Sequence, residues 1–281
     1  MSIALDQLRR LKREAGATRD ASPAVPAATS PPPARASIEQ LRQLLRVRAP
    51  TIVAPRAAAH ERTLPGTVLA PGLHLVETHL PDDALPPAFD GAFDRRDALD
   101  PARLLFFDTE TTGLAGGTGT RAFMIGAADW HDGGLRVRQL LIANTAAEGA
   151  MLDAFHGWLA HDTVLVSYNG KCYDAPLLAA RYRLARMGNP LADRAHVDLL
   201  YPTRRRYRGV HENCRLATIE RRVLQVVRED DLPGADAPAA WLRYLRGGDS
   251  GLLRRVLAHN HQDVVTLARL LRHLSEAAAA A

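Results

Sequence analysis

Cysteine is scarce in this chain of 281 residues, because Cys172 and Cys214 are the only two. Two cysteines are too few for a disulfide framework or for a four-cysteine zinc site, so we expect a reduced, cytoplasmic setting. No apolar run approaches the roughly 20 residues that a membrane span needs, and the amino-terminal stretch lacks the apolar core of a secretory signal. The sequence therefore predicts neither a membrane protein nor a disulfide-stabilised one.

Lysine is almost absent, with Lys12 and Lys171 alone, yet arginine brings the formal net charge to +5. A net positive charge favours a polyanionic partner such as nucleic acid. Heavy use of arginine and alanine can also follow from genomic base composition, so the charge does not decide the function. The length and the 47% hydrophobic content suit one well-cored domain with extensions.

The amino-terminal region divides into two parts by composition. Residues 1–50 hold two short amphipathic segments, Ala4–Arg13 and Ile38–Arg46, around a Pro/Ala/Ser-rich stretch in which proline excludes a helix. We expect a largely flexible extension there, whose segments are a basic surface, a docking motif for a protein or nucleic acid, or a membrane-surface helix. Residues 51–100 are predicted to be an irregular extension packed on the domain, with one strand at 73–77.

From residue 101 the hydrophobic pattern becomes regular. The predicted strands cover residues 104–108, 122–130, 135–143 and 163–167. Helices are predicted at 147–160 and 175–187, and the chain is mainly helical from Asp198 onward. Three strands in a meander, followed by helix, strand and helix, resemble the ribonuclease-H-like order. We expect an α/β domain over 101–275, with a mixed five-stranded sheet flanked by helices, and a disordered tail at 276–281.

Two carboxylates stand at the end of the most apolar strand, in the sequence FFDTETTG. Because side chains alternate along a strand, Asp108 and Glu110 point to the same face. Two like charges at the exit of a buried strand repel each other, and a divalent cation such as Mg²⁺ or Mn²⁺ removes that difficulty. The alternative for this motif alone is a solvated loop that begins at Asp108.

Two further acidic positions follow along the chain. Asp174 comes after the fourth predicted strand, where a helix begins, and such an aspartate is often a helix N-cap rather than a ligand. His259 and Asp263 are four residues apart in the carboxy-terminal helix and share a face. Alone, this pair could be a surface pair or a satisfied, partly buried one.

These segments resemble the three motifs of the DEDD exonucleases, in the same order. DTETTG resembles the first motif, Asp-x-Glu-Thr-x-Gly, and Asn169-x-x-x-Tyr173-Asp174 is similar to the second. His259-x-x-x-Asp263 lies where the third motif belongs. More narrowly, the chain from about 101 to 275 resembles a bacterial ribonuclease-H-like group of predicted exonucleases, the YprB type. This narrower similarity is carried by GGTGTRAFMIG, SYNGKCYDAPLL, HENCRLATIE, DDLPG and HNHQDVVTLARLL.

The resemblance implies a site for two divalent metal ions, Mg²⁺ or Mn²⁺. Asp108 would bridge both ions, Glu110 and Asp263 would hold the ion that activates water, and Asp174 would act on the second ion directly or through its waters. Two ions about 4 Å apart can clamp a scissile phosphate. The implied activity is a 3′–5′ exonuclease that releases nucleoside monophosphates from DNA or RNA.

The third motif departs from the superfamily patterns, Tyr-x-x-x-Asp and His-x-x-x-x-Asp. Ala258 stands where the second pattern has histidine, and His259 occupies the tyrosine place of the first. A near-neutral pKa suits His259 to act as a general base or to orient water. The alternative is a structural hydrogen bond to a neighbouring loop.

Several residues near the motifs are candidates for substrate binding. Lys171 could meet a phosphate or be a solvated loop lysine. The stretch from 204 to 228, with Arg228 at its end, carries eight arginines, and with interleaved tyrosines it suits backbone phosphates and stacked bases, or else forms a solvated helix face. Asp198 is expected to cap the short helix that follows it. The predicted substrate-binding residues are Thr111, Asn169, Lys171, Tyr173, Arg204, Arg205, Arg206 and Arg208.

Two other functions remain open on the same fold. A non-catalytic nucleic-acid-binding module is disfavoured, because four carboxylates repel phosphate unless a metal is present. An endonuclease or recombination nuclease is disfavoured by the Asp-x-Glu pair within one strand. We therefore expect an enzyme whose partner is nucleic acid, with no membrane, and with a possible protein partner at the amino-terminal extension.

Overall fold

The computed structural model describes residues 61–113, 119–229 and 231–280. The strands are β1 (Thr67–Ala70), β2 (Leu73–Pro81), β3 (Leu104–Thr111), β4 (Ala122–His131), β5 (Gly134–Ile142), β6 (Val164–Ser167) and β7 (His196–Asp198). The α-helices are α3 (Glu148–His156), α4 (Asp174–Leu184), α5 (Leu200–Tyr207), α6 (Leu216–Ile219), α7 (Ala237–Leu245) and α8 (Gly251–Ala279). The predictions for residues 1–50, including a protein partner at that extension, lie outside the described residues.

The strands form one mixed sheet in the order β1-β2-β5-β4-β3-β6-β7. β6 pairs in parallel with β3 and with β7, and the other neighbours are antiparallel. The prediction of five strands is wrong, because the described part of the chain contributes seven. β2 was predicted as a strand within an extension, but it pairs with β5 along its whole length and brings β1 into the sheet.

β2 joins the sheet because β5 would otherwise have an unpaired edge. Without β2 the N–H and C=O groups along one side of β5 would form an open sheet edge, which proteins avoid. β2 covers them from Leu73 opposite Ile142 to Pro81 opposite Gly134. The other predicted strands and the first two predicted helices are present as β3, β4, β5, β6, α3 and α4.

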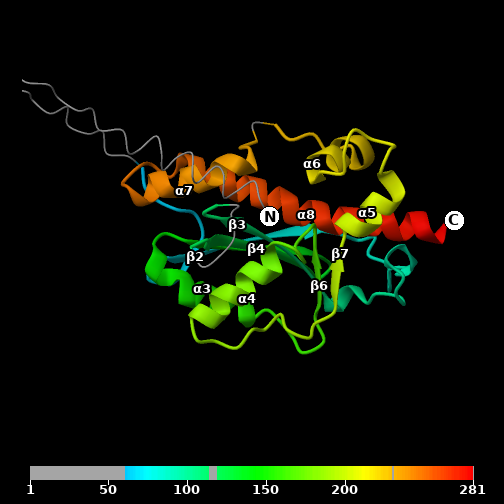
Figure 1. The fold of residues 1–281 in the computed structure, drawn as a ribbon, viewed down its shortest axis with the longest axis horizontal. Coiled ribbons are helices and arrows are strands. Elements are labelled where there is room, and N and C mark those ends of the chain that lie inside the picture. Colours follow the sequence, from blue (N-terminus) through cyan, green and yellow to red (C-terminus); the bar gives the residue numbers. More distant parts are fainter. Residues whose placement is uncertain (1–60, 114–118, 230, 281) are drawn as a thin grey trace, which may run out of the picture. The chain divides into compact units, whose positions relative to one another are not determined.

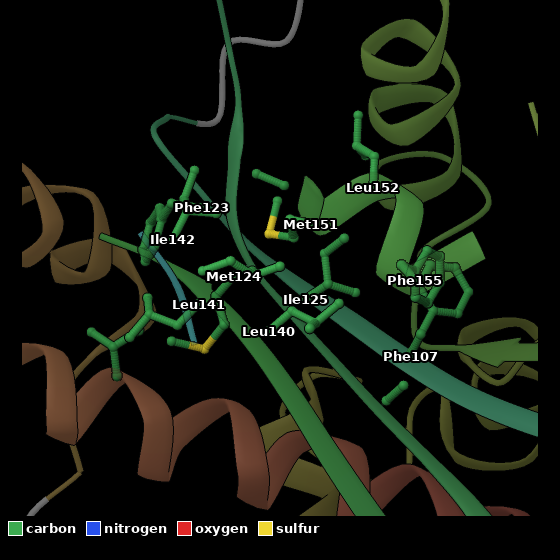
Figure 2. Close-up of a cluster of buried hydrophobic side chains, with 14 of the residues drawn as sticks. Phe107, Phe123, Met124, Ile125, Leu140, Leu141, Ile142, Met151, Leu152 and Phe155 are labelled. Atoms are coloured by element: carbon green, nitrogen blue, oxygen red, sulfur yellow. The ribbon is translucent and has the colours of Figure 1, made fainter. Parts of the chain in front are cut away.

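Helices cover both faces of the sheet, with α7 and α8 on one side and α3 and α4 on the other (Figure 1). α3 presents Met151, Leu152 and Phe155, which are buried against the strands, and Phe155 follows the other two by four and three residues. Figure 2 shows these side chains beside those of β3, β4 and β5, and the ring centroid of Phe155 lies 6.1 Å from that of Phe107. A buried side chain of this size stabilises the fold by about 1.5–3 kcal/mol.

The long helix α8 crosses the opposite face; its buried residues form one stripe up to Asn260, and from Val264 onward most of its residues are buried. The buried positions before residue 264 include Leu253, Val256 and Leu257, and those after it include Leu267, Leu271 and Leu274. Asn260 occupies the middle of this apolar stripe and is fully buried. A buried amide in such a stripe needs hydrogen-bond partners, because an unpaired one is costly.

Candidate active site

Alternation along β3 directs two carboxylates toward α8. Phe107 packs against α3, while Phe106 belongs to the core cluster that contains the carboxy-terminal half of α8. Asp108 and Glu110 continue the Phe106 face. The side-chain amide of Asn260 in α8 donates a hydrogen bond to Asp108 (Nδ2 to Oδ2, 3.0 Å). The strand therefore carries both acidic groups to the sheet face covered by α8, as predicted.

α8 supplies two further groups to the same place. His259 and Asp263 lie one helical turn apart, and His259 Nε2 is 3.4 Å from Asp263 Oδ2. One potential ligand atom each from Glu110, His259 and Asp263 lies within 4.8 Å of the others. The structure thus joins the first and third predicted motifs, although they are about 150 residues apart in the sequence.

Asp174 reaches this region from the start of α4. Its carboxylate accepts a hydrogen bond from the hydroxyl of Thr109, the β3 residue between Asp108 and Glu110. Asp108 and Asp174 both line a cleft with a volume of about 590 Å³. The second motif therefore lies beside the first, and an open cleft adjoins the carboxylates.

Burial and mutual repulsion hold the carboxyl groups toward their neutral forms. Burial raises the pKa of Asp108 well above its usual range, and the charges of Asp263, Asp174 and Glu110 add to the rise. Burial also raises the pKa of Glu110 to about 7 and that of Asp174 to about 6. The pKa of Asp263 is raised by burial too, although Arg228 and His259 oppose the shift.

Clustered hard oxygen donors with raised pKa values fit a divalent cation. Such a cation neutralises the repulsion that would otherwise favour protonation, and carboxylate oxygens are the ligands that Mg²⁺ and Mn²⁺ prefer. Asp108, Glu110, Asp174 and Asp263 are the residues that could hold it.

His259 lies between two carboxylates. Nδ1 is 2.8 Å from Asp231 Oδ1, and the guanidinium of Arg228 also lies within 3.1 Å of Nδ1. Burial alone would lower the pKa of His259, but Asp263, Asp231 and Glu110 together raise it. If Nδ1 carries the proton, it donates to Asp231 and cannot accept from Arg228.

Arg228 was predicted as part of a substrate surface, and the structure corrects this. Its guanidinium is mostly buried and pairs with Asp263, with Asp231 at 3.4 Å and with Glu220 at 2.6 Å. Glu220, only 1% exposed, also accepts a hydrogen bond from Thr266 of α8. Arg228 therefore joins the segment after α6 to the candidate site.

Asp198 has a larger role than the predicted helix cap. The N-cap residue of α5 is Leu199, so Asp198 precedes the cap, but one of its oxygens accepts a hydrogen bond from the first backbone N–H of the helix, that of Leu200. The same carboxylate accepts from the backbone N–H groups of Asn169 (2.7 Å) and Lys171 (3.1 Å). Asn169 has a φ of 66°, so this turn adopts a left-handed conformation that external bonds stabilise.

The predicted substrate residues fall into two groups. Thr111, Asn169 and Tyr173 line the cleft beside Asp108 and Asp174, and Lys171 is exposed in the same turn. The arginines belong to α5 and its end: Arg204, Arg206 and Arg208 are exposed, whereas Arg205 bonds the backbone of Phe93 and pairs with Asp94.

The sequence analysis did not place four residues beside the carboxylates. It assigned Arg228 to a substrate surface, and it gave no role at the site to Asp231, Glu220 or Asn260. Asp231 lies in DDLPG, a segment quoted for its resemblance alone. Asn260 could have been noticed as a polar residue within the apolar stripe of α8.

A model of the RNase_H superfamily matches residues 105–275. The chain belongs to the RNase_H superfamily. The protein YprB of Bacillus subtilis (strain 168) is 37% identical over 174 residues, which make up 62% of this chain and 42% of YprB. The chain therefore spans less than half of the length of this relative.

Two solved structures are similar to part of this chain. The family B DNA polymerase of Pyrobaculum calidifontis is 18% identical, with a TM-score of 0.47 over 70% of this chain and 28% of the polymerase. Exonuclease I of E. coli is 16% identical, with a TM-score of 0.36 over 56% of this chain and 43% of that protein. Family membership therefore depends on the matched family model.

Membership of the RNase_H superfamily confirms the ribonuclease-H-like α/β fold and the resemblance to the YprB type. Nucleases of this superfamily generally use divalent metals, which agrees with the cluster of Glu110, His259 and Asp263. Among the described helices, none combines the length and the apolar character needed to cross a bilayer.

Proposed function

We propose that this chain is a two-metal-dependent 3′–5′ exonuclease that hydrolyses phosphodiester bonds of DNA or RNA and releases nucleoside monophosphates. One observation carries the proposal: four carboxylates from β3, α4 and α8 gather beside an open cleft of about 590 Å³. The 3′–5′ direction is carried over from the resemblance of the three motifs to those of the DEDD exonucleases.

The carboxylates have the task of holding the ions. Asp108 interacts with each of the other three carboxylates, which suits a ligand shared by two ions. Glu110 and Asp263 would bind beside His259, and Asp174 would bind on the cleft side, where Thr109 orients it. Bound Mg²⁺ or Mn²⁺ supplies Lewis-acid activation of water and of the scissile phosphate.

His259 would take the role of general base or water-orienting group. With its proton on Nδ1 and donated to Asp231, the neutral ring keeps Nε2 as the acceptor. Nε2 faces Asp263 and the ligand cluster. Asp231 therefore selects the tautomer in which His259 can accept a proton from water.

The substrate strand would enter along the cleft. The exposed ring of Tyr173 stands next to Asp174 and offers a stacking surface for a base. Thr111 and Asn169 also line the cleft, and Lys171 lies in the adjoining turn. On α5, the exposed Arg204, Arg206 and Arg208 would neutralise backbone phosphates, and we expect less from Arg205 because Asp94 already pairs with it.

The deciding experiment is incubation of the purified protein with 3′- and 5′-labelled single- and double-stranded DNA and RNA, with Mg²⁺ or Mn²⁺. A ladder from 5′-labelled strands, together with early release of the 3′ label as a mononucleotide, supports the proposal. Internal cuts without mononucleotides would indicate an endonuclease or recombination nuclease. Tight binding without cleavage under any metal would indicate a binding module.

A further inference from the structure

Three residues lie directly opposite one another across the middle of the sheet. Asp108 of β3 is in register with Gly126 of β4, and Gly126 is in register with Gln139 of β5. Residues opposite each other in antiparallel strands share a face, so all three face α8. A carboxylate, a glycine and an amide thus form one row beneath the helix.

Asn260 of α8 connects the two ends of this row. Gln139 donates from Nε2 to Asn260 Oδ1 (3.0 Å) and to the Leu257 carbonyl (2.8 Å), and Asn260 donates from Nδ2 to Asp108 Oδ2 (3.0 Å). Gln139 is 2% exposed and Asn260 is 0% exposed. If the Asn260 amide were rotated by 180°, two donors would face each other and its oxygen would face the carboxylate. Gln139 therefore fixes which end of Asn260 meets Asp108.

Gly126 makes this arrangement possible. A Cβ atom at position 126 would lie 2.0 Å from Asn260 Oδ1, closer than any non-bonded contact. A glycine within a strand weakens the sheet and often marks a close approach of another group. Here that group is the side chain of Asn260, which reaches both Gln139 and Asp108 above the glycine.

We propose that Asn260, oriented by Gln139 above Gly126, is a positioning residue that fixes the Asp108 carboxylate for metal binding. Its hydrogen bond holds Oδ2 and leaves Oδ1 as a ligand with a defined orientation. This inference rests on the proposed metal-dependent function and adds a residue that contacts neither metal nor substrate.

The test is the Mn²⁺ affinity of the full chain, measured by isothermal titration calorimetry. Asn260→Leu keeps the approximate volume but removes the donor, and it should weaken binding roughly 10- to 100-fold, as expected for a hydrogen bond to a charged group. Gln139→Met should weaken it by a smaller factor, about 3- to 10-fold, because Asn260 loses its orientation but keeps its donor. In both variants excess Mn²⁺ should restore cleavage.

Leu274→Ala is the matched control, since it truncates a buried side chain of the same helix away from the row. It should lower the melting temperature and leave Mn²⁺ affinity unchanged. Folded Asn260→Leu with wild-type affinity would overturn the inference while the proposed function stands. If Asn260→Leu fails to fold, wild-type affinity in Gln139→Met overturns it instead. A wild-type protein that binds no Mn²⁺ would defeat the proposed function as well.

Discussion

His259 depends on its neighbours for any role in catalysis. The carboxylate of Asp231 contacts Nδ1 of His259, and Asp263 lies 3.4 Å from Nε2. One ring nitrogen therefore binds a loop residue, and the other faces the candidate site. The sequence left open whether His259 acts on water or makes a structural bond. The structure shows a bond to the loop residue Asp231 and, on the other side of the ring, a nitrogen that faces the carboxylates.

We expect His259→Ala to lower kcat by roughly 10²- to 10⁴-fold, the range for loss of general acid–base catalysis. Substrate affinity should change little, because the carboxylates and arginines remain. His261→Ala is the control: its ring bonds Thr78 of β2 rather than the site, so activity should persist despite a small loss of stability. Similar small effects on kcat in both variants would show that His259 is structural.

Asp108 is the carboxylate with the most like-charged neighbours. Asp108→Asn should abolish cleavage while the metal-free protein melts at the same or a higher temperature, because burial and three carboxylates already disfavour the charge. Mn²⁺ should then no longer raise the melting temperature. Differential scanning fluorimetry and the nuclease assay measure both effects.

The control for Asp108→Asn is Asp162→Asn, which removes an exposed carboxylate beside Arg103. It should leave both activity and the response to Mn²⁺ intact. Retained cleavage in Asp108→Asn would remove Asp108 from the proposed site.

At the scale of elements, the sequence predicts some parts of the site and not others. The faces of Asp108 and Glu110 follow from alternation in β3, and the pairing of His259 with Asp263 follows from helical spacing. Asp231 and Arg228 lie in an irregular segment. Tertiary contacts determine the path of that segment, so the local sequence pattern does not predict where these two side chains lie. The row beneath Asn260 needs the register of three strands and the distance to α8, which no local pattern contains.

The segment after α6 is held to α8 by two contacts, the ion pair of Arg228 with Asp263 and the hydrogen bond from Thr266 to Glu220. A π-helical turn, Glu220–Leu224, places Glu220 against Arg228, at 2.6 Å, and against Thr266 of α8. Such turns often occur where a side chain must be directed to a functional site. Here Glu220 holds the guanidinium that contacts Asp263.

Glu220→Ala should therefore lower the free energy of unfolding by about 1–3 kcal/mol, because the buried Arg228 and Thr266 lose an acceptor while Asp263 and Asp231 still pair with the guanidinium. Glu212→Ala is the matched control, since Glu212 pairs with Arg221 and Arg222 on the exposed surface of the same region. The loss of stability in Glu212→Ala should be much smaller, because an ion pair on the exposed surface contributes little to stability. Urea denaturation compares the two, and equal losses would contradict the assigned role of the buried pair.

For the whole molecule, the metal site opposes folding when no metal is bound. Burial raises the pKa of Glu110 from 4.5 to about 7, so the native state holds this proton more tightly than the unfolded chain. The contribution of Glu110 to the free energy of unfolding is complete below about pH 4.5 and is lost as the pH rises through about 7. His196, whose pKa burial lowers to about 4, acts in the opposite direction up to about pH 6.5.

Comparison with Glu110→Gln separates the two effects, because this variant keeps His196 and mimics the neutral Glu110. In EDTA the free energy of unfolding of the variant should exceed that of the wild type by less than about 1 kcal/mol near pH 5 and by up to about 3 kcal/mol at pH 8, since one pKa unit corresponds to about 1.4 kcal/mol. Mn²⁺ at pH 8 should stabilise only the wild type and reduce the difference. Urea denaturation across pH 5–8 measures it, and a difference that does not grow with pH would contradict the raised pKa of Glu110.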